Sequence, residues 1–139
     1  MFFLPASYVF HVPEVDIYVK TKKVWGGKFY VMFSEKKNIS FFSDVDYIET
    51  ETGFCSISIV FDKENKKNIA VHGWGKLNKI NQKKFNIQWS DIDYGWDDKY
   101  RDEDGKFKNP PFSFMSIGTK EYVVYLNGKC LHDGGLLGR

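Results

Sequence analysis

Short runs of alternating apolar and polar residues recur along the chain, separated by clusters of Gly, Asn, Asp and Lys. Alternation with a period of two is typical of half-buried β-strands, because successive side chains point to opposite faces of a sheet. The pattern predicts eight strands, joined as consecutive hairpins. These strands are Val15–Lys20, Lys28–Phe33, Ile39–Ser43, Gly53–Phe61, Lys67–Gly73, Phe85–Trp89, Phe112–Ile117 and Glu121–Leu126.

Two hairpins carry the clearest signals. The first joins residues 54–61 to residues 68–71 through a polar, lysine-rich turn. On its first arm we expect the serines to face outward and the apolar residues to face the core, the latter being Cys55, Ile57 and Ile59. The second has the turn signal Asn127-Gly128, which predicts that the chain folds back through Lys129–Leu131.

Helical signals are weak throughout the chain. No window shows a sustained three-four spacing of apolar residues, and alanine, the best helix former, occurs only at Ala6 and Ala70. The sequence therefore predicts an all-β fold, an antiparallel β-sandwich of about seven to eight strands, with a small barrel as the alternative. At 139 residues we expect one domain, with an N-terminal arm at residues 1–10, C-terminal strands within 105–131 and a mobile tail at 132–139.

Composition narrows the classes of partner. The net charge is only +2 and arginine occurs only at Arg101 and Arg139, so a base-reading or nucleic-acid-binding role is not expected. No apolar run is long enough for a membrane span and no signal peptide is recognisable, which predicts a cytoplasmic protein. The cysteines Cys55 and Cys130 have no metal spacing with the histidines, so reduced thiols and no metal or cofactor are expected.

The most informative segment changes from basic to acidic. Residues 63–84 contain seven lysines and one acid, Glu64, whereas residues 91–104 contain seven acids against Lys99 and Arg101. Opposite patches with tryptophans between them favour docking of a charged protein partner, because complementary potentials fix orientation and aromatic rings anchor interfaces. The alternative is that both patches are ordinary charged loops exposed to solvent, with no role in binding.

This segment resembles a known family. The spacing Trp74-x-Lys76-Leu77-x-Lys79, a lysine-rich spacer, the turn Asp93-Tyr94-Gly95-Trp96 and the acidic run 102–104 are similar to the CS domain of the small co-chaperones of heat-shock protein 90. The similarity covers residues 11–104 and is specific over 74–104. The aromatic, strand-like residues 107–131 depart from the acidic tails of that family.

The resemblance implies a non-catalytic sandwich that binds the ATP-bound state of a chaperone of the heat-shock protein 90 type. No enzymatic activity is expected. An exposed edge strand in residues 107–131 would leave dimerisation open. The expected partner-binding residues are Trp74, Lys76, Leu77, Lys79, Lys84, Asp93 and Trp96.

Other functions remain open from the sequence. Residues 121–129 are similar to the late strand and turn of galectin-like and laminin-G-like domains, which gives carbohydrate binding as the alternative function, although the galectin His-x-Asn-Pro-Arg run is missing. An irregular calcium loop within Asp91–Asp104 and a pair of catalytic carboxylates for glycoside hydrolysis are weaker alternatives. His72 is either part of the binding patch or a packed strand residue.

Overall fold

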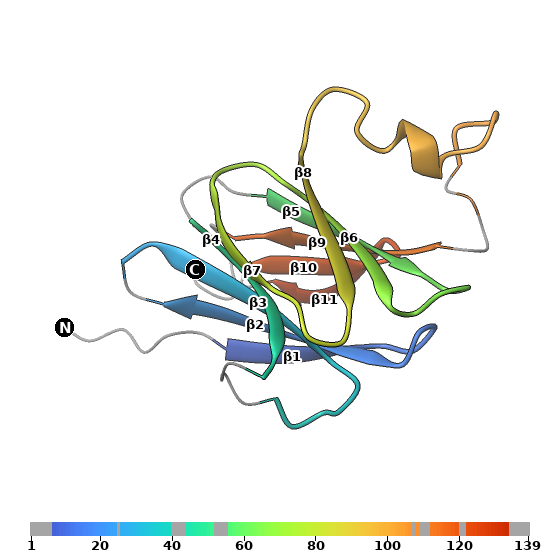
Figure 1. Cartoon of the computed structure of the whole chain (residues 1–139). Helices are drawn as coiled ribbons and strands as arrows, with labels where there is room; N and C mark the ends of the chain where they lie inside the picture. The colour runs from blue at the N-terminus through green and yellow to red at the C-terminus, as the bar shows by residue number, and fades with distance from the viewer. Residues whose placement is uncertain are drawn as a thin grey trace.

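The computed structural model describes residues 7–24, 26–39, 44–51, 56–106, 108, 112–119 and 122–133. These residues form eleven strands and one short 3-10 helix (Figure 1). The elements are β1 (Ser7–Val12), β2 (Ile17–Val24), β3 (Lys28–Ser34), β4 (Asp46–Glu51), β5 (Ser56–Asp62), β6 (Asn68–Gly73), β7 (Leu77–Asn81), β8 (Asn86–Asp91), η1 (Asp98–Tyr100), β9 (Phe112–Gly118), β10 (Val123–Leu126) and β11 (Lys129–Asp133).

Two sheets pack face to face, which confirms the predicted all-β sandwich. The five-stranded sheet has the order β1-β2-β3-β4-β7, and the six-stranded sheet has the order β11-β10-β9-β5-β6-β8. Every neighbouring pair is antiparallel except β6 and β8, which run parallel because the chain crosses to the other sheet as β7 and returns. The strands β9, β10 and β11 complete the six-stranded sheet, so these three C-terminal strands belong to the same sandwich.

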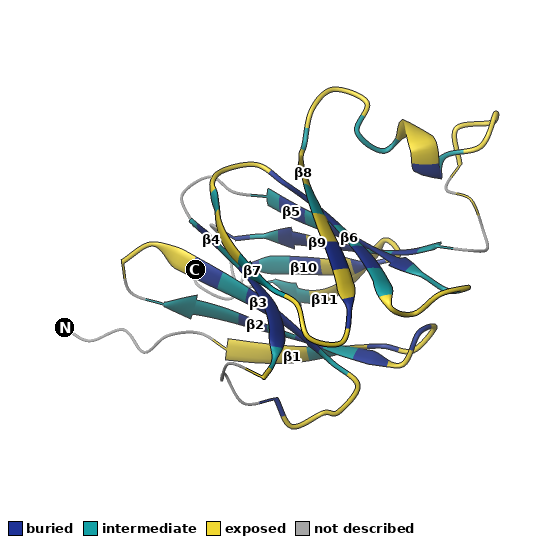
Figure 2. Cartoon of the chain, in the orientation of Figure 1, coloured by how far each residue is buried: buried dark blue, intermediate teal, exposed yellow. Residues whose placement is uncertain are grey.

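The core lies between the sheets and follows the predicted alternation. On β5, Ile57 and Ile59 are fully buried, whereas Ser56 and Ser58 point outward and are half-buried (Figure 2). The arm pairs with β6 as an antiparallel hairpin, as the sequence predicts. Cys55 lies outside the described residues. Large aromatic rings fill the centre of the core, among them Phe29, Phe33 and Phe61.

Three strands were missed by the sequence pattern, which explains why the structure has eleven strands and not seven or eight. β1 begins at Ser7, within the stretch expected to be an arm, and pairs with β2 along its whole length. β4 has charged or hydroxyl side chains at most positions, and β7 reads as part of a binding motif, so neither has the composition of an apolar strand. Ile39, expected to start a strand, lies in a loop, and residues 40–43 are outside the described part of the chain.

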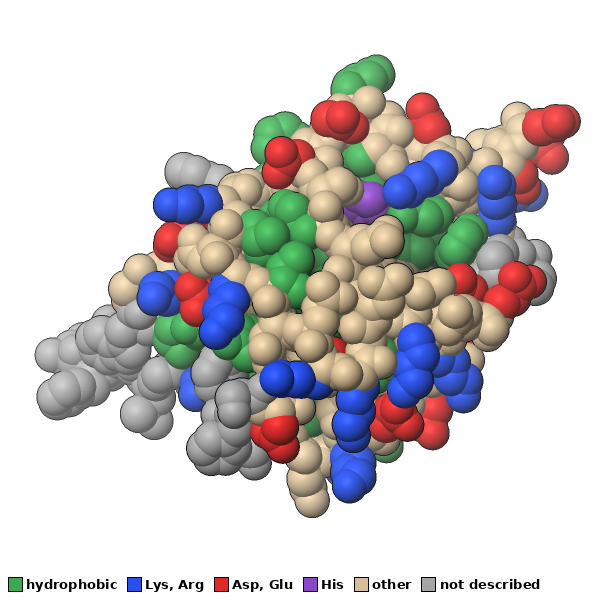
Figure 3. Space-filling view, viewed as in Figure 1, with side chains coloured by type: hydrophobic (Ala, Val, Ile, Leu, Met, Phe, Trp, Pro, Cys, Tyr) green, Lys and Arg blue, Asp and Glu red, His purple; other side chains and the backbone are tan. Residues whose placement is uncertain are grey.

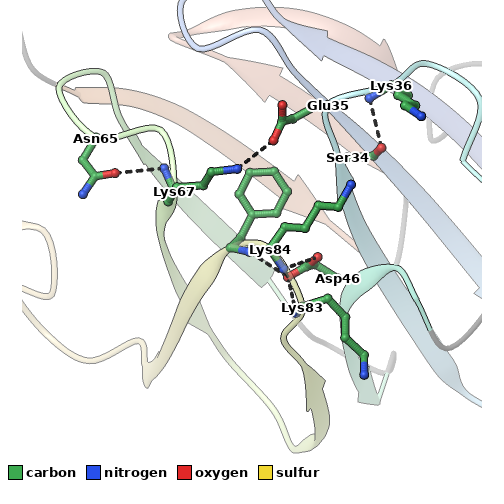
Figure 4. A network of polar contacts seen from close by, with 9 residues as sticks. Ser34, Glu35, Lys36, Asp46, Asn65, Lys67, Lys83 and Lys84 are labelled. Atoms are coloured by element: carbon green, nitrogen blue, oxygen red, sulfur yellow. Dashed lines mark hydrogen bonds and ion pairs between the residues drawn. The ribbon is translucent and has the colours of Figure 1, made fainter.

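Asp46 holds the turn between β7 and β8. Its carboxylate is almost fully buried and accepts hydrogen bonds from the backbone N–H groups of Lys83, Lys84 and Phe85 at 2.7–3.0 Å (Figure 4). A buried carboxylate needs such donors to replace its lost hydration. The first residue of β4 thus fixes where β8 begins in the other sheet.

The C-terminal hairpin has the predicted two-residue turn. Asn127 and Gly128 both have positive φ, 49° and 84°, which is the backbone that a type I′ turn requires. Leu126 pairs with Lys129 across the turn, and a β-bulge follows further along β11. The strand β11 extends to Asp133, two residues beyond the expected end, and residues 134–139 lie outside the described residues.

Candidate carbohydrate-binding face

The outer face of the six-stranded sheet, which points away from the core, carries aligned rows of polar side chains. The pairing registers place Asn86 beside Asn68, and Asp62 beside Phe112. The next row starts with Gln88 beside Ala70. Residues that lie opposite one another in a ladder project from the same face, so the amide side chains of Asn68, Asn86 and Gln88 share this face with the small apolar Ala70.

A shallow pocket lies over these rows. Its volume is about 180 Å³, smaller than the roughly 300–1,000 Å³ of typical small-molecule sites. The pocket therefore suits one part of a larger ligand that lies along the surface. We call it the amide pocket; its polar and aromatic lining comprises Asp62, Asn68, Asn86, Gln88, Tyr100 and Phe112.

The amide groups of the pocket are ordered by hydrogen bonds. Asn86 Nδ2 donates to Asn68 Oδ1 at 3.3 Å, and Asp62 Oδ1 accepts the backbone N–H groups of Glu64 and Asn65 at 2.9 and 3.2 Å. Asn86 and Gln88 are both exposed. An amide has two donor hydrogens and an acceptor oxygen, so donors and acceptors remain for a ligand.

Two aromatic rings form the wall of the amide pocket. Tyr100 and Phe112 meet edge to face, with ring centroids 5.1 Å apart. Tyr100 comes from η1 in the loop that follows β8, whereas Phe112 projects outward from the first residue of β9. Tyr100 is only 6% exposed, so the partly exposed Phe112 offers most of the accessible ring surface. An aromatic surface beside amide groups suits a ligand that has both apolar faces and hydroxyl groups.

His72 fixes the loop that supplies Tyr100. Its imidazole is only 3% exposed. Nε2 shares a hydrogen bond with the Tyr100 hydroxyl at 3.0 Å, Nδ1 shares one with the Ser90 hydroxyl, and the Trp96 ring lies over the imidazole at 4.7 Å. Burial, and next the positive charge of Lys99, lower the pKa of His72 below its ordinary value, and Asp93 opposes this shift. His72 is therefore a packed residue that orders the site from beneath.

The structure divides the first half of the expected docking motif between sheets. Trp74 follows β6 and is 57% exposed, and Lys76 is also exposed. Leu77 begins β7 in the five-stranded sheet, where its side chain packs against the core. Lys79, two residues later, lies over the Tyr47 ring at 5.6 Å. The four residues thus pass from one sheet to the other and do not share one face.

The second half of the motif is also spread out. Lys84 is in the turn held by Asp46, close to Lys67, whose ammonium bonds Glu35 at 2.7 Å (Figure 4). That hydrogen bond and the charge of Lys67 lower the pKa of Glu35. Asp93 and Trp96 lie in the loop after β8, beyond the other end of that strand. Lys84 is therefore far along β8 from Asp93 and Trp96.

Most of the acidic segment, residues 91–104, lies in the loop that carries η1. Figure 3 shows acidic side chains around this end of the molecule and several lysines toward the opposite end. Asp97 pairs with Arg101 at 2.8 Å, and Asp102 accepts the backbone N–H groups of Asp104 and Lys106. Within the described residues, no group of three or more His, Cys, Asp or Glu side chains is placed to hold a metal ion. The same part of the chain contains no helix long and apolar enough to span a membrane.

No family model, curated protein or solved structure matches this chain. The function therefore has to be inferred from the site itself.

The amide pocket was missed from the sequence although most of its residues lie in predicted strands. Asn68 falls in the predicted strand Lys67–Gly73, and Asn86 and Gln88 in Phe85–Trp89. Alternation indicates that such residues point outward, and that signal was available. The sequence contains no signal that β6 and β8 are neighbours, because they are not consecutive and pair only after the chain has crossed to the other sheet and returned.

Proposed function

We propose that this protein binds carbohydrate, without catalysis, through the outer face of its six-stranded sheet. The observation that carries the proposal is the amide pocket, where Asn68, Asn86 and Gln88 lie beside the rings of Tyr100 and Phe112. A sugar ring presents hydroxyl groups, which pair with amide donors and acceptors, and C–H faces, which pack on aromatic rings.

The shape of the site supports this ligand class. The amide pocket is shallow and open, and its side chains are held by strands and by the His72 network. Rigid sites lose less conformational entropy when a polar ligand binds. The resemblance of residues 121–129 to the late strand and turn of galectin-like and laminin-G-like domains also supports the proposal, since these residues include β10 and the start of β11 in the same sheet.

A glycan array with the whole protein tests the proposal. The variant Asn86→Ala/Gln88→Ala removes two exposed amides from the amide pocket without disturbing the core. Asn78→Ala is the matched control, because Asn78 is an exposed amide on β7 in the other sheet. We expect the double variant to lose binding to the glycans that the wild-type protein binds, and the control to retain that binding. A protein that binds no glycan, or a double variant that binds as well as wild type, would refute the proposal.

Exposed Trp74 supports a second candidate function, binding of a chaperone of the heat-shock protein 90 type. Gly73 and Asp91 are paired at the ends of parallel strands, so Trp74 and the fully exposed Tyr94 leave the sheet at the same end. Two exposed aromatic residues at one end could anchor a protein partner. Pull-down of the purified chaperone with a non-hydrolysable ATP analogue tests this candidate: retention lost in Trp74→Ala would support it, and no retention by wild type would exclude it.

A further inference from the structure

Phe112 lies between two hollows, one on the outer face of the six-stranded sheet and one at the end of the sandwich, where Glu14 from the turn between β1 and β2 contacts Asn127. One is the amide pocket. The other, which we call the lysine pocket, has Phe112 in common with it and is lined by Glu14, Lys63, Lys108, Phe112, Phe114 and Asn127. A ligand in the amide pocket can therefore continue over the Phe112 ring into the lysine pocket.

The wall of the lysine pocket is ordered by Asn127. Its side-chain oxygen accepts the backbone N–H of Phe114 at 2.9 Å, and its Nδ2 donates to Glu14 Oε1 at 2.7 Å. Phe112 and Phe114 project outward because they alternate with Ser113 and Met115, which are buried. The base of this pocket is thus aromatic, and one oxygen of Glu14, the one carboxylate among its described lining residues, already has a partner.

The two pockets differ in charge. The lysine pocket combines two ammonium groups, Lys63 and Lys108, with one carboxylate, Glu14. Among the residues that the structure describes, the lining of the amide pocket has no ammonium group and one carboxylate, Asp62. A net positive pocket with an aromatic base favours an anionic group attached to a ring, because ammonium groups form strong charge-assisted hydrogen bonds with carboxylate or sulfate oxygens.

The two pockets adjoin at Phe112, and together they are longer than one sugar ring. The backbone N–H of Lys108 donates to the carbonyl of Tyr100, a wall of the amide pocket, at 2.8 Å. Asn86 on β8 and Asn127, next to β10, are separated by four strand spacings, about 19 Å at the usual spacing of neighbouring strands. A ligand that fills both pockets to their far walls is therefore a chain of several sugar units.

We propose that the ligand is an acidic oligosaccharide: an uncharged sugar unit occupies the amide pocket, the chain crosses Phe112, and a carboxylate or sulfate group lies between Lys63 and Lys108. This inference rests on the proposed function and specifies the class of carbohydrate for the same face.

Calorimetric titration with three hexasaccharides tests the inference. Hyaluronan hexasaccharide carries carboxylates, chondroitin sulfate hexasaccharide carries carboxylates and sulfates, and chitohexaose carries no acid. We expect at least one acidic hexasaccharide to bind roughly tenfold more tightly than chitohexaose, and the difference to shrink as salt screens the charges. Tighter binding of the hyaluronan hexasaccharide would indicate a site for a carboxylate, and tighter binding of the chondroitin sulfate hexasaccharide would indicate a site for a sulfate. Equal binding of chitohexaose, or no binding of either acidic hexasaccharide, overturns the inference.

Variants separate this inference from the proposed function. Lys108→Ala should weaken binding of the preferred acidic hexasaccharide roughly tenfold. Lys106→Ala should not, because Lys106 is exposed in the same loop but does not line the pocket. Loss of binding in Asn86→Ala/Gln88→Ala with no change in Lys108→Ala would keep carbohydrate binding and overturn the acidic ligand. Loss of binding in Lys108→Ala with no change in Asn86→Ala/Gln88→Ala would overturn the proposed function, and the inference with it.

Discussion

The ring of Trp89 occupies the space that a side chain at Gly73 would need. A Cβ atom at Gly73 would lie 2.2 Å from Cη2 of Trp89 and 2.8 Å from Cζ2. Both residues belong to the parallel pair β6 and β8, and the Trp89 ring packs against the core. The absence of a side chain at Gly73 therefore lets this tryptophan reach the core from an edge strand.

Replacing Gly73 by alanine should destabilise the protein. The new methyl group must displace the Trp89 ring, and overpacking of this kind typically costs about 1–3 kcal/mol. Urea unfolding followed by tryptophan fluorescence measures the change. Gly118→Ala is the control, since a Cβ there would be 3.9 Å from its nearest neighbour, the carbonyl oxygen of Val123. Equal losses in the two variants would contradict the packing argument.

Asp46→Asn should destabilise the protein although it conserves shape. The carboxylate accepts three backbone N–H groups, whereas an amide has one acceptor oxygen and brings its own hydrogens toward those donors. Loss of hydrogen bonds to a buried charge costs roughly 2–3 kcal/mol. Thermal unfolding of Asp46→Asn beside Asp44→Asn, an exposed neighbour, checks this. Two unchanged melting temperatures would mean that Asp46 does not hold the turn.

Stability should fall as the pH is lowered through the range of histidine. Burial lowers the pKa of His72 in the folded protein, so the unfolded chain takes up a proton at a higher pH than the folded one. Unfolding is then favoured as the pH falls below the ordinary pKa of 6.5, and the loss levels off below the lowered pKa. Urea midpoints from about pH 7.5 to pH 5 measure this. In His72→Gln the dependence should be shallower; an identical dependence would assign it to other groups.

The hydroxyl groups of Thr21 and Tyr122 form a hydrogen bond between the two sheets. Both residues are buried, and burial raises the pKa of Tyr122 above its ordinary value. Thr21→Val and Tyr122→Phe each leave one buried hydroxyl without this partner, which should cost about 1–3 kcal/mol. The double variant should cost less than the sum of the two single losses. Strict additivity in chemical unfolding would show that the two hydroxyls do not interact.

The sequence predicted those parts of the fold that depend on local alternation and turns. β5, β6 and the Asn127-Gly128 hairpin all lie where the pattern placed them, because one face of each strand is apolar and the turn residues have few alternatives. β4 was missed because Ile48 is the only apolar residue among its core-facing positions, which are Asp46, Ile48 and Thr50. Asp46 is buried only because it accepts hydrogen bonds from Lys83, Lys84 and Phe85, which are distant in the sequence.

The candidate site depends on contacts that alternation does not encode. The contact between Asn68 and Asn86 requires the parallel pairing of β6 and β8, which are separated in the chain by β7. His72 was correctly considered as a packed residue, whereas its partners Ser90 and Tyr100 could be identified only in three dimensions. The docking motif shows the opposite relation, because residues close in sequence lie apart where the chain changes sheets at Leu77.

The parallel direction of β6 and β8 also makes this protein a scaffold for engineering. Both strands end at the same edge of the sheet, and residues 74–76 and 92–97 follow them there. Combinatorial libraries in these two segments would diversify one continuous rim, while Tyr100 stays anchored to His72 and the paired strands keep their register. New binding specificities could thus be selected by display methods without redesigning the hydrophobic core between the two sheets.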